Sequence, residues 1–169
     1  MPERQTLERA RRDRRQGKAP STQAGEFVKE EMDHIRAGKH GARSAKQAIA
    51  IGLSKARRAG VDLPPPRKGQ SSERTRKSAS RDYARGHGTP ARRKSTAKRS
   101  RASTRALKRE GTSAASHRAL ARQASGAARR RTRSERSTAA RRAARTKGPA
   151  ERSAAARKAA RTRQAHPST

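Results

Sequence analysis

Apolar residues larger than alanine recur at helical spacing in one stretch of the chain, residues 25–66. Two runs follow the i, i+4, i+7 pattern of an amphipathic helix, one from about Glu26 to Gly38 and one from Ser44 to Gly60. The linker between them is short enough for the two helices to lie antiparallel as an αα-hairpin. The expected core of this hairpin consists of Phe27, Val28, Met32, Ile35, Ile49 and Leu53.

Local signals mark the ends of the second helix. Ser44 is followed three residues later by Gln47, which is the spacing of a capping box. Gly60 followed by apolar Val61 is typical of a Schellman stop. The prolines at 64–66 then favour an extended spacer that closes the unit.

Few apolar residues lie outside the hairpin. The 169 residues include 34 Ala but only 14 larger apolar residues, and residues 67–169 hold three of these, Tyr83, Leu107 and Leu120. Too little apolar surface is then available to offset the conformational entropy lost on folding. The sequence predicts a mostly disordered chain with a small all-α element: a basic arm (1–24), the helical hairpin (25–66) and a disordered, low-complexity Arg/Ala-rich tail (67–169).

The tail contains a repeat. Residues 135–146 recur as residues 151–162, and ten of the twelve positions are identical. Ala and Arg both favour helix, but the like charges of Arg141 and Arg145, and of Arg157 and Arg161, oppose it at i, i+4 spacing. We expect these repeats to be coil in the free chain and nascent helix once their charge is neutralised.

Charge indicates the class of partner. The chain has 47 Lys or Arg and 13 Asp or Glu, a formal net charge of +34, and residues 67–169 carry +27 of it. Such a polycation favours a polyanion, because each Lys or Arg placed on a phosphate releases a condensed counterion. The candidate nucleic-acid contacts are Arg57 and Arg58 in the hairpin and, in the tail, Arg129, Arg130, Arg131, Arg133, Arg141, Arg142, Arg145, Arg157, Lys158 and Arg161.

These features predict nonspecific binding of duplex DNA, with compaction or bridging of DNA in the bacterial nucleoid. Duplex DNA is favoured over RNA loops or single strands, which need aromatic stacking platforms, because the chain has one Phe and one Tyr. Two alternatives stay open: a basic protein associated with RNA or the ribosome, and a protein-interaction module that the tail localises. The apolar area is marginal for a lone hairpin, so a homodimer through the faces of Ile49 and Leu53 is the simplest additional partner.

Other chemistries have little support in the sequence. The chain has no Cys, and its longest apolar runs are too short to cross a membrane, so we expect neither a disulfide framework nor a membrane partner. No catalytic motif occurs, and we expect neither an enzyme nor a cofactor nor a small-molecule substrate. His34 and His40 are separated by five residues and by the stop at Gly38, with Asp33 as the nearby carboxylate, so no metal site is expected. The acids Glu30 and Glu31 are expected to act as helix-dipole partners.

Two resemblances add to this interpretation. The stretch from Gly25 to Arg57, above all Gln47-Ala-Ile-Ala-Ile-Gly-Leu-Ser54, resembles an uncharacterised family of small basic bacterial proteins whose core reads K-x-R-Q-A-I-A-I-A-L-S. The resemblance implies a bacterial or phage-like origin and DNA binding. Gly52 stands where those proteins often have Ala, which is expected to weaken the second helix. In composition, the tail resembles the basic tails of bacterial histone-H1-like proteins.

Overall fold

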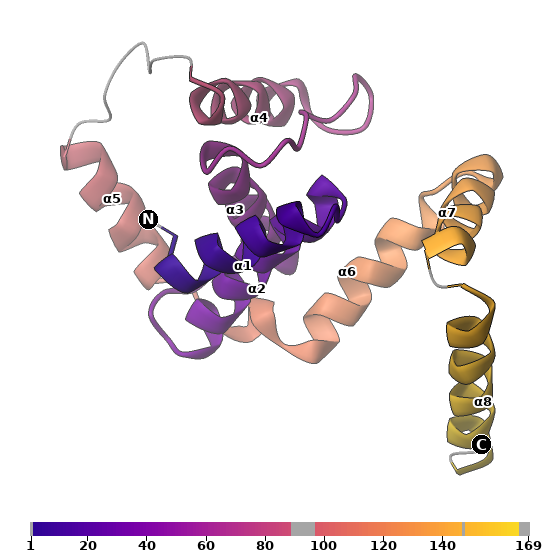
Figure 1. The fold of residues 1–169 in the computed structure, drawn as a ribbon. Helices are drawn as coiled ribbons and strands as arrows, with labels where there is room; N and C mark the ends of the chain where they lie inside the picture. The colour runs from indigo at the N-terminus through magenta and orange to yellow at the C-terminus, as the bar shows by residue number, and fades with distance from the viewer. Residues whose placement is uncertain (1, 89–96, 147, 166–169) are drawn as a thin grey trace. The chain divides into compact units, whose positions relative to one another are not determined.

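The computed structural model describes residues 2–88, 97–146 and 148–165, and about 75% of the chain is helical (Figure 1). The described residues form these elements in chain order: α1 (Arg4–Arg15), α2 (Pro20–Arg36), α3 (Ala45–Arg58), α4 (Glu73–Gly86), α5 (Ala97–Lys108), the 3₁₀ turn η1 (Ser113–Ala115), α6 (His117–Arg129), α7 (Arg133–Thr146) and α8 (Pro149–Ala165). The chain divides into two compact units, residues 1–123 and 124–169.

The expected mostly disordered chain with a two-helix hairpin is therefore wrong. The arm at 1–24 forms α1 and the start of α2, and the tail is helical over most of its described length. The error came from treating alanine as too small to build a core. Among the described residues, nine of the thirteen buried apolar residues are Ala, including Ala24, Ala48 and Ala56 with no exposed surface. Small side chains let helices pack closely, so alanine side chains are enough to form a buried core.

In the first unit, α2 packs against both α1 and α3, and α3 also packs against α4. Two apolar clusters fill the contacts between these helices. One is formed by Phe27, Ala10, Ala24, Ala56 and Val61, with Leu7, Leu53 and Leu63 packed against it. The other is formed by Met32, Ile35, Ala42, Ala48, Ala114 and Ala115, with Val28, Ile49 and Leu120 packed against it. Of the six expected core residues, Phe27, Met32 and Ile35 are buried and the other three are half-buried.

The local signals for α3 act as expected. The Ser44 hydroxyl accepts a hydrogen bond from the Gln47 amide at 3.2 Å, while the Gln47 side chain accepts one from the Arg43 amide at 2.9 Å. This is a close variant of the capping box. At the other end, Val61 N donates to Ala56 O and Gly60 N donates to Arg57 O, which together make a Schellman motif.

The segment after α5 completes the hairpin's surroundings. The amide of Gly41 donates to Leu107 O at 2.9 Å, and the amide of Ala42 donates to Gly111 O at 3.2 Å. The buried turn η1 then contacts both α2 and α3. Part of the segment expected to be tail is therefore a structural component of the first unit.

The second unit contains the end of α6, α7 and α8. Thr132 begins α7 with a reciprocal capping box, in which the Thr132 amide donates to Glu135 Oε2 at 2.8 Å and the Glu135 amide donates to Thr132 Oγ1 at 3.2 Å. Gly148 precedes α8, and Pro149 occupies its first position. None of the helices in the described part of the chain is long and apolar enough to span a membrane.

Candidate nucleic-acid interface

The second unit has a high density of exposed positive charge. Residues 124–169 contain 14 Lys or Arg and two Glu. The predicted contacts here are all exposed: Arg129, Arg130, Arg131, Arg133, Arg141, Arg142, Arg145, Arg157, Lys158 and Arg161. They lie at the end of α6, in the link to α7, and on α7 and α8.

The helices of this unit lack an apolar seam. Every side chain described on α8 is exposed, and on α7 only Ala144 is partly covered. A helix that is polar on all sides gains little from packing, and the Arg pairs at i, i+4 repel each other. Phosphates placed along these helices would relieve that repulsion.

The two arginines predicted in the hairpin lie in the first unit and have different surroundings. The Arg57 side chain turns inward, where Nε donates to Leu63 O at 3.0 Å and Nη2 to Pro64 O at 3.4 Å. Burial lowers the pKa of Arg57, although the charge of Asp82 opposes this. Arg58 is exposed and lies 3.8 Å from Asp82. Arg57 thus holds the proline segment, and its guanidinium is not presented to a ligand.

A groove in the first unit is a feature that the sequence analysis missed. It has a volume of about 790 Å³ and is lined by Arg11 and Arg14 of α1, by Phe27, and by Tyr83 and His87 at the end of α4. The rings of Tyr83 and His87 stack with centroids 4.0 Å apart. The Tyr83 hydroxyl donates to Asp62 at 2.6 Å, and this hydrogen bond raises the pKa of Tyr83. The i, i+4 spacing of Tyr83 and His87 on a helix was the available signal.

The acids of α2 also differ from expectation. Because α2 begins at Pro20 rather than near Glu26, Glu30 and Glu31 lie in its middle and not at its N-terminus. Both are buried beside Lys55 of α3, whose Nζ lies 3.1 Å from Glu30 Oε1 and 2.7 Å from Glu31 Oε2. Burial opposes the charge of Lys55, but its contacts with Glu31 and Glu30 raise its pKa. These acids therefore join α2 to α3.

The comparison with protein families finds one similarity in the first unit. Residues 3–68 match the model of a family of unknown function, DUF6496. The match covers α1, α2, α3 and the proline segment, and it supports an uncharacterised domain in this part of the chain. The match also includes α1, which lies outside residues 25–66, the stretch that carried the sequence resemblance. No curated protein and no solved structure matches the chain.

Proposed function

We propose that the chain binds duplex DNA without sequence specificity, through phosphate contacts made mainly by the second unit, and that it coats or compacts DNA in the bacterial nucleoid. The observation that carries this proposal is the set of exposed cations on α7 and α8, with two carboxylates among residues 124–169. Arg grips phosphate with two parallel hydrogen bonds, and each contact releases counterions.

The carboxylates of the first unit are paired internally, although this unit is also basic, with 33 Lys or Arg against 11 Asp or Glu over residues 1–123. Its carboxylates are used within the unit: Asp13 pairs with Lys18, Glu26 with Arg9, and Glu30 and Glu31 with Lys55. In the second unit, by contrast, Glu135 is engaged in capping α7. The second unit has an excess of 12 cations in 46 residues, a higher density than the excess of 22 in the 123 residues of the first unit, which favours it as the main contact for a polyanion.

A triple substitution tests the assignment. Arg141, Arg142 and Arg145 are changed together to Gln, and duplex DNA affinity is measured over a range of salt concentrations. Each lost phosphate contact lowers the log–log salt slope by about 0.9, so the slope should fall by about 3. The matched control changes Arg74, Lys77 and Arg81 of α4 to Gln, which removes the same charge from the first unit. If both variants weaken binding equally, net charge alone governs it and the assignment to α7 is wrong.

RNA is the second candidate ligand, because the groove places a stacked Tyr83–His87 pair beside two arginines. Aromatic side chains on which bases stack are typical of single-stranded and loop recognition. The same titrations are therefore repeated with a structured RNA of matched charge and with Tyr83→Leu. Tighter binding of the RNA than of the duplex, lost in Tyr83→Leu, would favour the RNA function over duplex binding.

A further inference from the structure

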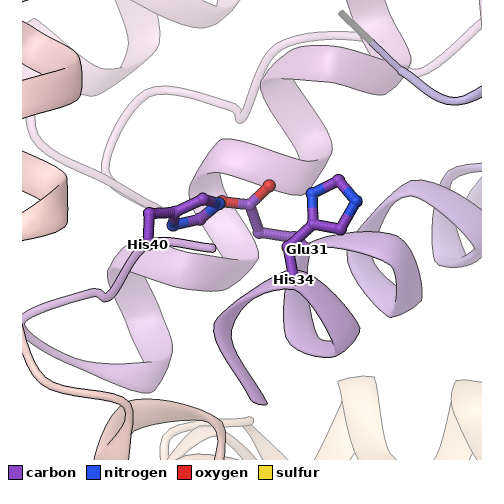
Figure 2. A group of neighbouring side chains, drawn as sticks. All are labelled: Glu31, His34 and His40. Carbon is purple, nitrogen blue, oxygen red and sulfur yellow. The ribbon is translucent and has the colours of Figure 1, made fainter. Parts of the chain in front are cut away.

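Three side chains that can each offer a metal ligand meet at the end of α2. Glu31 and His34 lie one helical turn apart on α2, and His40 returns to the same place after the chain reverses at Gly38, which has φ +69°. One ligand atom from each of the three lies within 4.8 Å of the others. Figure 2 shows the Glu31 carboxylate between the two imidazole rings.

The Glu31 carboxylate is fully buried and incompletely partnered. Its side chain has no exposed surface, and neither oxygen accepts a hydrogen bond of normal geometry. The nearby groups are Lys55 Nζ, 2.7 Å from Oε2, and His40 Nε2, 3.4 Å from Oε1. A buried carboxylate is costly unless a cation and good hydrogen bonds compensate it. Lys55 compensates one oxygen, which leaves Oε1 facing the histidines.

The outward nitrogens of both histidines are engaged as in metal sites. His34 Nε2 lies 2.7 Å from Glu3 Oε1, and His40 Nδ1 lies 3.2 Å from Gly41 O. Metal-bound histidines almost always direct their second nitrogen to a carboxylate or a backbone carbonyl. Since Glu3 occupies Nε2 of His34, the nitrogen that Figure 2 shows on the Glu31 side is Nδ1. Nδ1 of His34 and Nε2 of His40 are then left for a shared ligand.

The distances fit a tetrahedral ion. Two ligands that each lie about 2.0–2.1 Å from Zn²⁺ at a tetrahedral angle are about 3.3–3.4 Å apart. The 3.4 Å between His40 Nε2 and Glu31 Oε1 matches this spacing and is long for a direct N–H···O hydrogen bond. The remaining pairs are at most 4.8 Å apart and must close to about 3.3–3.4 Å around a tetrahedral ion.

The charge around the site also admits a cation. Glu3, Glu30 and Glu31 contribute three carboxylates, while Lys39 and Lys55 contribute two ammonium groups. With both histidines neutral, as metal ligands are, the cluster has a formal charge of −1 before a metal binds.

We propose that Glu31, His34 and His40 bind one divalent transition-metal ion of the Zn²⁺ class, with Glu3 orienting His34 and Lys55 retaining the other oxygen of Glu31. The ligand set of two imidazoles and one carboxylate suits Zn²⁺ and its neighbours rather than Ca²⁺ or Mg²⁺. The ion ties the linker between α2 and α3 to α2, and through Glu3 it holds the N-terminal segment. With three protein ligands, the fourth tetrahedral position is left for water, and the proposed site is independent of nucleic-acid binding. No metal site was expected from the sequence, because Asp33 is the carboxylate next to His34 along the chain and Glu31 comes beside both histidines only in the fold.

The test uses the full chain without an affinity tag, because tag histidines bind metals themselves. Zn²⁺ is titrated in competition with a chromogenic chelator, and Co²⁺ is added separately to record the ligand-field absorption of a tetrahedral site. We expect one Zn²⁺ per chain. Glu3→Gln replaces the carboxylate partner of His34 with a neutral amide and should weaken binding about 10- to 100-fold, and His40→Gln should weaken it at least as much.

The matched control is His117→Gln, which removes an exposed histidine at the start of α6 and should leave Zn²⁺ binding unchanged. Equal affinity of the His40 and His117 variants, or no saturable binding to the wild type, would overturn the proposal. If His40→Gln loses the helical circular dichroism signal, the variant has unfolded, and the NMR resonances of the histidine rings in the wild-type chain test the site instead. Zn²⁺ must then shift those of His34 and His40 and leave those of His87 and His117 in place; any other pattern overturns the site.

Discussion

At the scale of single residues, Glu3 links the N-terminal segment to the end of α2. Its side chain accepts hydrogen bonds from His34 at 2.7 Å and Lys39 at 3.1 Å, and its backbone amide donates to Glu30 at 3.0 Å. The hydrogen bond with His34, and then that with Lys39, lowers the pKa of Glu3 from 4.5 to about 2. Glu3 therefore keeps its charge, and with it this contact, until the pH falls toward about 2.

This shift gives a prediction for Glu3→Gln in the metal-free chain. A carboxyl whose pKa is lowered in the folded state contributes stability above its unfolded pKa of 4.5, and the contribution is lost as the pH falls toward about 2. The wild type should therefore exceed the variant in stability above pH 4.5, and the difference should shrink toward zero near pH 2. Urea unfolding across this pH range measures it. The control is Glu8→Gln, which removes an exposed α1 carboxylate paired with Arg4. A difference that stays constant with pH would contradict the role of Glu3.

Part of this cluster could be predicted from the sequence, but the residues that partner it could not. Glu31 and His34 at i, i+3 share a helix face, which was a readable signal. It was misread because the start of the helix was placed near Glu26, so that Glu31 counted as a dipole partner. Glu3 and Lys55 are distant in sequence from this pair, and only the packing of α1 and α3 on α2 brings them there.

At the scale of the elements, Gly52 sets how closely α2 and α3 approach. A Cβ at Gly52 would lie 2.7 Å from Val28 Cα and 3.0 Å from Phe27 O, and both are backbone atoms that cannot move aside without moving the helix. The Gly that was expected to weaken the second helix therefore also permits its closest contact.

Substitution of Gly52 by Ala should consequently destabilise the protein. Helix propensity alone favours Ala over an interior Gly by about 1 kcal/mol, but the clash forces the helices apart at a cost of about 1–3 kcal/mol. Gly25→Ala on α2 is the matched control, because a Cβ there meets nothing within 4 Å and should stabilise by up to about 1 kcal/mol. Denaturant unfolding of both variants compares the signs. A stabilising Gly52→Ala would show that the helices do not pack this closely.

Helices that contain apolar residues larger than alanine were easier to predict than helices that bury mainly alanine. The spacing of Met32 and Ile35 revealed α2, and the cap at Ser44 revealed α3. By contrast, α1 buries Ala10 with Leu7 beside it, and η1 buries Ala114 and Ala115. Alanine periodicity is hard to read in a chain where alanine is frequent everywhere, so these elements could not be separated from low-complexity sequence.

At the scale of the whole molecule, the two units differ in how their charged residues are used. In the first unit, the carboxylates form internal ion pairs around a small alanine-rich core. The second has exposed Arg and Ala on all sides of its helices. Composition places +27 of the net charge in residues 67–169, but it gave no measure of how much helix these residues form. Intrinsic propensity and the cap at Thr132 supply that helix without a buried face.

The expected oligomeric state depends on which residues cover the apolar faces of the hairpin. The homodimer was inferred because the faces of Ile49 and Leu53 needed cover. In the structure Leu53 packs against the cluster that contains Phe27 and Ala10, and Ile49 packs against the cluster that contains Ala114 and Ala115. Because α1 and η1 provide this cover within one chain, we expect the full chain to be monomeric without nucleic acid.

Sedimentation of the full chain over a wide range of concentrations checks this expectation, with high salt used to suppress charge repulsion that would mask association. A monomer would carry one basic second unit, so at low chain density it should coat single duplexes, and energy transfer between two labelled duplexes should stay low. A concentration-dependent dimer would contradict burial within the chain. It would also place two basic units on one particle, and bridging would then rise through effective concentration. The two measurements must agree, because bridging by a monomer would require the first unit to bind a second duplex by itself.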